Sequence, residues 1–312
     1  MSSSPIKKVI VVGGSGLTGA EIVRHLLRAN FDVSVLSRAS SNAPVPEGAK
    51  VIKTDYSHNS LVDAFKCQDA VVSAMATFHL DQQFPVIDAA AEAGVRRFIP
   101  SEYGVDTSGP AITKLVPLTG LKRDTIERLK TKQSTGMSWT GLIVGAFFDS
   151  IFDMPGILGV NMAGKTITVY DGGDVPFEAT NLAQIGRAVT AILSAEHLDE
   201  TANRYIYINS FTISQNQMLK TFQDLSGNAF EVNHAKKQEA QTVAEEKMRA
   251  GPSDEEAFGR GNYEGIVLLM LNHGGFCEFS KTKGLWNDKL GLPHENVDET
   301  LEKVLASKGL VK

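Results

Sequence analysis

The chain has 312 residues, and 42% of them are hydrophobic, which is ample to bury a sizeable core. Its formal net charge of −5 excludes the basic footprint of proteins that bind nucleic acid or an anionic membrane surface. Two cysteines cannot make a disulfide framework, and no signal-peptide pattern precedes the first apolar run, so we expect a cytoplasmic protein. The longest apolar run, residues 265–271, is too short to span a bilayer, and no membrane contact is expected.

The first hundred residues alternate short apolar runs with amphipathic segments. Strands are predicted at 8–12, 31–36, 51–54, 70–74 and 97–100. Helices are predicted at 17–28, 60–65 and 82–93. Strands that alternate with helices indicate parallel βαβ units, whose ligands bind beyond the carboxyl ends of the strands. We therefore predict an α/β fold with a Rossmann-type, doubly wound parallel sheet.

The second half of the chain is less regular. Strands are predicted at 139–144, 165–170 and 204–209, and helices at 121–129, 181–193, 212–225, 237–249 and 296–306. Turn residues at 251–254 break the pattern. We expect a dinucleotide-binding domain over residues 1–155, extended by 165–200, and a smaller, irregular substrate-binding part over residues 201–312.

A glycine-rich loop joins the first predicted strand to the first predicted helix. Gly13 permits a tight turn, Gly16 lets backbone amides approach a pyrophosphate, and Gly19 lets the helix pack closely. The spacing is GxxGxxG, and the strand before and helix after it are the context that such a motif requires. The loop therefore predicts a dinucleotide site that includes Ser15 and Leu17. The alternative is a packing turn that binds nothing.

The residues after the second predicted strand indicate which dinucleotide is bound. An NAD site usually carries Asp or Glu here to hold the ribose hydroxyl, but residues 37–42 contain no carboxylate. Arg38 stands where a guanidinium could pair with a 2′-phosphate, which favours NADP(H). The alternative for Arg38 is an ordinary solvated surface arginine.

Catalytic groups of other common kinds are missing from the sequence. No tyrosine is followed by a lysine four residues later, so the acid–base pair of common short-chain dehydrogenases is absent. His58, His79 and His294 show no metal-ligand spacing, and we predict no metal site. Any catalysis therefore needs another acid–base group.

A longer motif carries a family resemblance. Residues 96–104 read RRFIPSEYG, and they follow the glycine loop and Arg38 in the order found in one group of enzymes. The chain resembles the isoflavone reductase-like branch of the NmrA-like, atypical short-chain dehydrogenases, which includes plant pinoresinol-lariciresinol and phenylcoumaran benzylic ether reductases. The family pattern is K/R-R-F-x-P-S-E-F-G, in which Tyr103 replaces the final Phe. Weaker matches extend over nearly the whole chain, and the variation looks fungal, which suggests secondary metabolism.

The resemblance implies a lysine general acid–base at the start of a helix written K-x-x-I-R-x-x-L. Lys122 to Leu129 has the same length, so Lys122 is the match, with Lys114 and Lys130 as nearby competitors. Lysine suits this task when burial and neighbouring charge bring its pKa toward working pH. Ile126 stands where the family has arginine, a departure that concerns the substrate more than the cofactor.

The resemblance also assigns further contacts. Ser101, Glu102 and Phe147 match positions expected at the cofactor, and Tyr103 and His273 match positions near the substrate. The leading hypothesis is an NADPH-dependent reductase, a candidate homodimer, that transfers hydride to an enone or benzylic carbon of an aromatic or polyketide-like small molecule. The alternatives are a dinucleotide-sensing regulator without turnover and an isomerase or dehydratase that keeps the fold.

Overall fold

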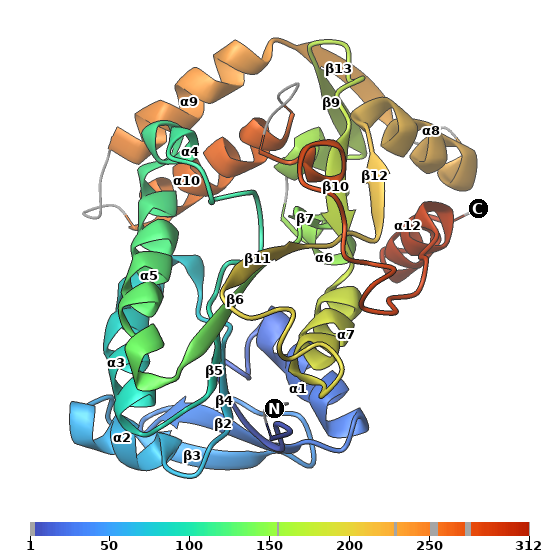
Figure 1. Ribbon diagram of the computed structural model, residues 1–312. Coiled ribbons are helices and arrows are strands. Elements are labelled where there is room, and N and C mark those ends of the chain that lie inside the picture. The colour runs from blue at the N-terminus through green and yellow to red at the C-terminus, as the bar shows by residue number, and fades with distance from the viewer. Residues whose placement is uncertain (1–3, 155, 228–229, 250–254, 272–275, 312) are drawn as a thin grey trace.

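A seven-stranded parallel sheet forms the centre of the molecule (Figure 1). The computed structural model describes residues 4–154, 156–227, 230–249, 255–271 and 276–311. In spatial order the strands are β11 (Arg204–Tyr207), β6 (Ser138–Ile143), β5 (Arg97–Ile99), β4 (Ala70–Ser73), β1 (Lys8–Val12), β2 (Asp32–Arg38) and β3 (Lys50–Thr54). The order reverses between β1 and β4, which is where open α/β sheets bind ligands. The predicted fold class is confirmed.

The strands read as continuous apolar runs because the sheet is buried on both faces. Val9 and Val11 of β1 pack on one side, in a cluster with α1 (Leu17–Arg28) and α7 (Leu182–Leu193). Ile10 and Val12 alternate with them and pack on the other side. That side is covered by α2 (His58–Phe65), α3 (Gln83–Glu92) and α5 (Gly120–Thr131).

The rest of the chain builds a second layer above the carboxyl ends of the strands (Figure 1). Two three-stranded sheets lie there: β12 (Phe211–Ile213), β10 (Phe177–Thr180) and β7 (Ala146–Phe147), and β13 (Glu231–Ala235), β9 (Thr166–Tyr170) and β8 (Val160–Asn161). Its helices include α4 (Ala111–Leu115), α6 (Phe148–Ile151), α8 (Gln215–Ser226), α9 (Lys237–Arg249), α10 (Glu255–Met270), α11 (Phe279–Thr282) and α12 (Val297–Ser307). An aromatic-rich core holds this layer together.

Two sequence predictions are modified here. The helix predicted from residue 212 begins at Gln215, because Ser214 caps it through a capping box with Gln217, while residues 211–213 pair with β10 as a strand. The strand at 204–207 follows the expected boundary at residue 200, yet it pairs with β6 in the main sheet. The predicted break at 251–254 lies outside the described residues.

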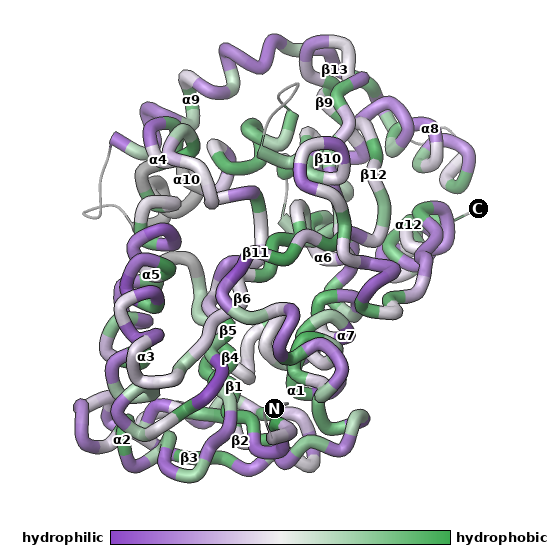
Figure 2. The backbone as a smooth tube through the Cα atoms, viewed as in Figure 1, coloured by the Kyte–Doolittle hydropathy of each residue, from purple (hydrophilic) through white to green (hydrophobic). Residues whose placement is uncertain are grey.

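The outer surface of the second layer is more polar than its core. Helix α9 is largely hydrophilic along its length, whereas green, hydrophobic stretches mark the interior elements (Figure 2). The apolar run that begins at residue 265 lies mostly within α10. Within the described residues, no helix is long and apolar enough to cross a membrane.

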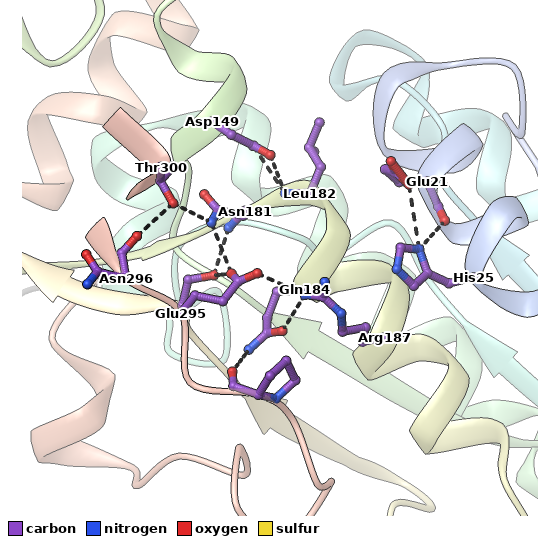
Figure 3. A network of polar contacts seen from close by, with 12 residues as sticks. Glu21, His25, Asp149, Asn181, Leu182, Gln184, Arg187, Glu295, Asn296 and Thr300 are labelled. Atoms are coloured by element: carbon purple, nitrogen blue, oxygen red, sulfur yellow. Dashed lines mark hydrogen bonds and ion pairs between the residues drawn. The ribbon is translucent and has the colours of Figure 1, made fainter. Parts of the chain in front are cut away.

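A polar network ties the C-terminal segment to the sheet domain (Figure 3). Glu295 accepts hydrogen bonds from Asn181 at 3.0 Å and from Arg187 at 2.9 Å. Asp149 accepts the Leu182 backbone N–H at the start of α7, and burial raises the pKa of this carboxyl to about 6. The network ties the segment before α12 to α7, which packs on the main sheet.

Candidate active site

A cavity of about 410 Å³ opens at the carboxyl ends of the strands, beside the point where the strand order reverses. The predicted site residues that line it are Gly13, Ser15, Gly16, Leu17, Arg38, Ser101, Tyr103, Lys122 and Phe147. Gly19 and Glu102 do not line it, and His273 lies outside the described residues. Segments far apart in the sequence therefore form one site, because parallel strands bring their carboxyl ends to the same edge.

The three loop glycines meet different steric demands. Gly13 has φ +83°, and a Cβ there would lie 2.5 Å from the Ala74 carbonyl oxygen. A Cβ at Gly19 would lie 2.2 Å from the Gly13 carbonyl oxygen, so this residue permits the close approach of α1 to the loop. A Cβ at Gly16 would meet the same oxygen only at 3.4 Å, and its neighbour Leu17 is 60% exposed. Two glycines shape the loop, and Gly16 faces the open side.

The first turn of α1 keeps its backbone N–H groups available. Gly16 is the N-cap of this helix and offers no side chain that could accept a hydrogen bond from those groups. A helix N-terminus with unsatisfied donors and the positive end of its dipole is a site for an anion. The loop therefore fits a phosphate group in both shape and electrostatics.

Arg38 lies at the carboxyl end of β2, on the rim of the cavity. It is exposed and makes no ion pair with any carboxylate in the described part of the chain. The ammonium of Lys53 donates to the carbonyl oxygen of Ser41 and to Ser37 Oγ, which holds the turn after β2 in place. Lys53 has no motif signal in the sequence, since its role depends on the pairing of β2 with β3.

Lys122 lies on the first turn of α5 and is 8% exposed. Its Nζ donates to the backbone oxygens of Glu102, at 2.5 Å, and of Tyr103, at 3.3 Å. Burial lowers the pKa of Lys122, and the Glu102 carboxylate opposes this shift. A lysine with a lowered pKa in a cavity wall can act as a general acid or base.

The competing lysines lie elsewhere. Lys114 and Lys130 are both exposed, Lys130 pairs with Glu127 at 2.8 Å, and neither lines the cavity. Ile126, where the family pattern has arginine, packs in the core beneath the sheet. Arg128, the other candidate for that arginine, pairs with Asp88 on α3. Of these residues, Lys122 alone lines the cavity.

Glu102 was expected to contact the cofactor, but its side chain lies behind the cavity wall. The residue is fully buried, Thr107 donates to its Oε2, and its Oε1 has no hydrogen-bond partner among the described residues. Burial raises the pKa of this carboxyl, and the Lys122 charge counteracts the rise. Glu102 acts on the site through its backbone oxygen and its charge.

A smaller, apolar pocket adjoins the cavity. It shares Tyr103, Lys122, Phe147 and Tyr263 with the larger cavity, and Lys122 is the one charged residue in its wall among those described. The apolar part of the wall includes Val105, Ala146, Ile151, Ile266, Val267 and Met270. Sequence reasoning missed the α10 contribution, because an apolar helix face looks the same whether it meets a core or a ligand. No group of three metal-ligating side chains occurs in the described segments.

Known proteins resemble the chain over most of its length. A model of the NmrA-like family matches residues 5–266. The oxidoreductase aprR of Aspergillus flavus is 34% identical over 308 residues, which cover 96% of this chain and 98% of the relative. An isoflavone reductase homolog of maize is 28% identical over 73% of this chain and 77% of its own length. The solved structure of AtPrR2 with NADP+ and (+)-pinoresinol superposes with a TM-score of 0.71 at 23% identity, covering 97% of this chain and 100% of that one.

The parallel sheet with its glycine loop, together with these relatives, defines an oxidoreductase of Rossmann type. The chain belongs to the NmrA-like family, as its glycine loop and RRFIPSEYG block predicted. The expected likeness to isoflavone and pinoresinol-lariciresinol reductases is confirmed as well.

Proposed function

We propose that the protein is an NADPH-dependent reductase that transfers hydride to an enone or benzylic carbon of an aromatic or polyketide-like small molecule. The observation that carries this proposal is the position of Lys122. It lies in the wall shared by the large cavity and the apolar pocket, where a cofactor and a substrate would meet. The presence of NADP+ and (+)-pinoresinol in the similar structure of AtPrR2 supports the proposal.

The residues of the large cavity fit an NADP molecule. The uncapped N-terminus of α1 would hold the pyrophosphate, and Gly16 leaves room for it. Arg38, which has no carboxylate partner within the described residues, would pair with the 2′-phosphate. Phe147 would pack against the nicotinamide end, between the two cavities. When bound, the cofactor supplies the hydride.

Lys122 supplies the proton in this scheme. Its ammonium would donate one proton to the substrate oxygen that gains an electron pair. For an enone this is the carbonyl oxygen, and for a benzylic ether it is the oxygen whose bond to the benzylic carbon breaks. Charge then does not accumulate on that oxygen. The backbone oxygens of Glu102 and Tyr103 hold the ammonium in place through their hydrogen bonds. Because burial lowers the pKa of Lys122, the proton leaves more readily than from a solvated lysine.

Single-turnover oxidation of NADPH, with a panel of phenolic enones, tests this function. Lys122→Ala should lower the rate by roughly 10²–10⁴-fold, the usual contribution of a general acid. Lys122→Arg should not restore it, because arginine does not release its proton near neutral pH. Cofactor affinity should change much less, since we expect the glycine loop and Arg38 to provide most of the cofactor binding.

Lys130→Ala is the matched control, because Lys130 lies on the same helix outside the cavity. It should turn over at the wild-type rate. A near-normal rate in Lys122→Ala would remove this lysine from the mechanism. Tight NADPH binding without oxidation by any member of the panel would favour a dinucleotide sensor instead.

A further inference from the structure

One face of α10 forms a wall of the apolar pocket. Tyr263, Ile266, Val267 and Met270 all line it, and their spacing of three, one and three residues places them on the same side of a helix. The helix belongs to the second layer, far in sequence from the glycine loop and from Lys122. The pocket is therefore completed by a segment that none of the recognised motifs includes.

Tyr263 differs from the other α10 residues in this wall, because it carries the only polar side chain among them. It also lines the larger cavity, so it lies at the same junction as Lys122. The chain lacks a tyrosine and lysine at the short-chain dehydrogenase spacing, yet the tertiary structure brings one tyrosine and one lysine to a common cavity.

The hydroxyl of Tyr263 has no assigned task within the protein. It makes no hydrogen bond with any residue that the structure describes, although its ring packs against the aromatic-rich core. Tyr103 also lines both cavities, but its hydroxyl is sealed inside the protein without a partner. The side chain of Tyr263 is only partly buried and lines both cavities, so its hydroxyl is the one of the two that we expect a ligand to reach.

The state of this hydroxyl suits hydrogen-bond donation. Burial raises the pKa of Tyr263, so the phenol remains protonated throughout the pH range in which Lys122 would work. Lys122 is the one charged residue in the described pocket wall, and a carboxylate or phosphate on the substrate would find no second cation there. The pocket thus suits an uncharged framework that carries separate oxygen atoms.

We propose that Tyr263 is a substrate-binding residue that donates a hydrogen bond to a second oxygen of an uncharged substrate, while Lys122 acts on the reacting oxygen. This inference rests on the proposed reductase function, and it adds a specificity determinant to it. The substrate class that follows is a neutral aromatic or polyketide-like molecule with two oxygen functions, separated by an apolar framework that contacts Ile266 and Met270.

The test compares Tyr263→Phe with wild-type protein for two probes. One is the phenolic enone that binds the NADP+ complex most tightly, and the other is the same enone without its phenolic oxygen. Affinity is measured by calorimetry on the protein saturated with NADP+, so the readout does not need turnover. Loss of one hydrogen bond should weaken binding of the phenolic enone about tenfold and leave the other probe unchanged.

Tyr170→Phe serves as the matched control. Tyr170 is a partly buried tyrosine of the same hydrophobic cluster, but it lines neither cavity, so its variant should bind both probes normally. Equal affinity of Tyr263→Phe and wild type for the phenolic enone would overturn the inference. So would an equal loss for both probes, or failure of the wild-type complex to bind any enone of the panel.

The outcome is separable from that for the reductase function. Suppose that the phenolic enone binds Tyr263→Phe more weakly than wild type but NADPH is not oxidised. The binding role of Tyr263 then stands, and the reductase proposal fails. If Lys122→Ala loses turnover while Tyr263→Phe binds normally, the reductase proposal stands and the role of Tyr263 fails.

Discussion

Two buried cations lie at opposite ends of β5, and their surroundings differ. Arg97, at the amino end, is 2% exposed and donates to Ser138 Oγ at 2.8 Å, Thr140 Oγ1 at 2.9 Å, Thr201 Oγ1 at 3.0 Å and the Leu198 carbonyl. Lys122, packed against the carboxyl end, donates to two backbone oxygens and faces a cavity. The first cation is held by four side-chain and backbone acceptors of the protein, and the second lines a cavity.

The comparison shows that one sequence block serves two purposes. The RRFIPSEYG segment supplies Arg97 to a structural network, whereas Glu102 and Tyr103 from the same segment provide the oxygens that hold Lys122. A buried charge that is held by several hydrogen bonds within the protein stabilises one conformation. A buried charge with neighbouring unpaired atoms, such as Glu102 Oε1, marks the place where a functional role is expected.

The largest expected effect concerns stability and Arg97. Arg97→Met removes all four hydrogen bonds and leaves the Leu198 carbonyl with only the long contact from Thr201 Oγ1 at 3.4 Å, so the free energy of unfolding should fall by about 3 kcal/mol or more. Arg96 is the partly exposed neighbour, which pairs with Asp69 and donates to Ser4 and Pro5. Arg96→Met should lose only about 1 kcal/mol, because water can replace these partners. Urea unfolding of both variants measures the difference. Equal losses of unfolding free energy would show that the buried Arg97 contributes no more to stability than the partly exposed Arg96.

A second prediction extends the comparison to the carboxyl end of β2. Arg38→Ala should weaken NADPH binding by about 10- to 100-fold, because a charge-assisted hydrogen bond to the 2′-phosphate is lost. Affinity for NADH and stability to urea should be unchanged, since Arg38 makes no ion pair within the described residues. Arg28→Ala, an exposed arginine at the end of α1, is the control. Fluorescence titration with both cofactors measures these affinities. An equal loss of affinity for NADPH and NADH in Arg38→Ala would contradict the pairing of Arg38 with the 2′-phosphate.

The smallest expected effect concerns the charge behind Lys122. The Glu102 carboxylate favours the ammonium form, so Glu102→Gln should lower the pKa of Lys122. The general acid would then lose its proton at lower pH, and the basic limb of the kcat profile should move down by about one pH unit.

The other titratable groups near Glu102 and Lys122 are unchanged in the Glu102→Gln variant, so they should not cause the shift of the limb. The charge of Asp106 raises the pKa of Glu102, and Tyr205, Tyr103 and Tyr263 keep their protons because burial raises their pKa values. Turnover measured between about pH 6 and pH 10 gives the basic limb. A limb that does not move would mean that Glu102 is protonated in the wild-type protein and does not tune Lys122.

The sequence by itself determined the features that depend on neighbours along the chain. A strand, a glycine loop and a helix follow one another within residues 8–28, and the chemistry of phosphate binding needs only that local unit. The same holds for the RRFIPSEYG block and for the start of α5, which together located Lys122. Continuous apolar runs likewise predicted the buried parallel sheet, because a strand that is covered on both faces is apolar at successive positions.

Only the tertiary structure decided what surrounds those units. Glu102 lies behind the cavity wall because Thr107 holds its carboxyl, a contact that no motif encodes. Short strands such as β12 exist because β10 offers them a partner, and two or three residues are too few for a periodic signal. Tyr263 and Lys122 come from distant helices, and they line the same cavity only because the second layer packs over the carboxyl ends of the strands. Contacts between distant segments depend on how whole layers pack, and a linear pattern carries no record of that geometry.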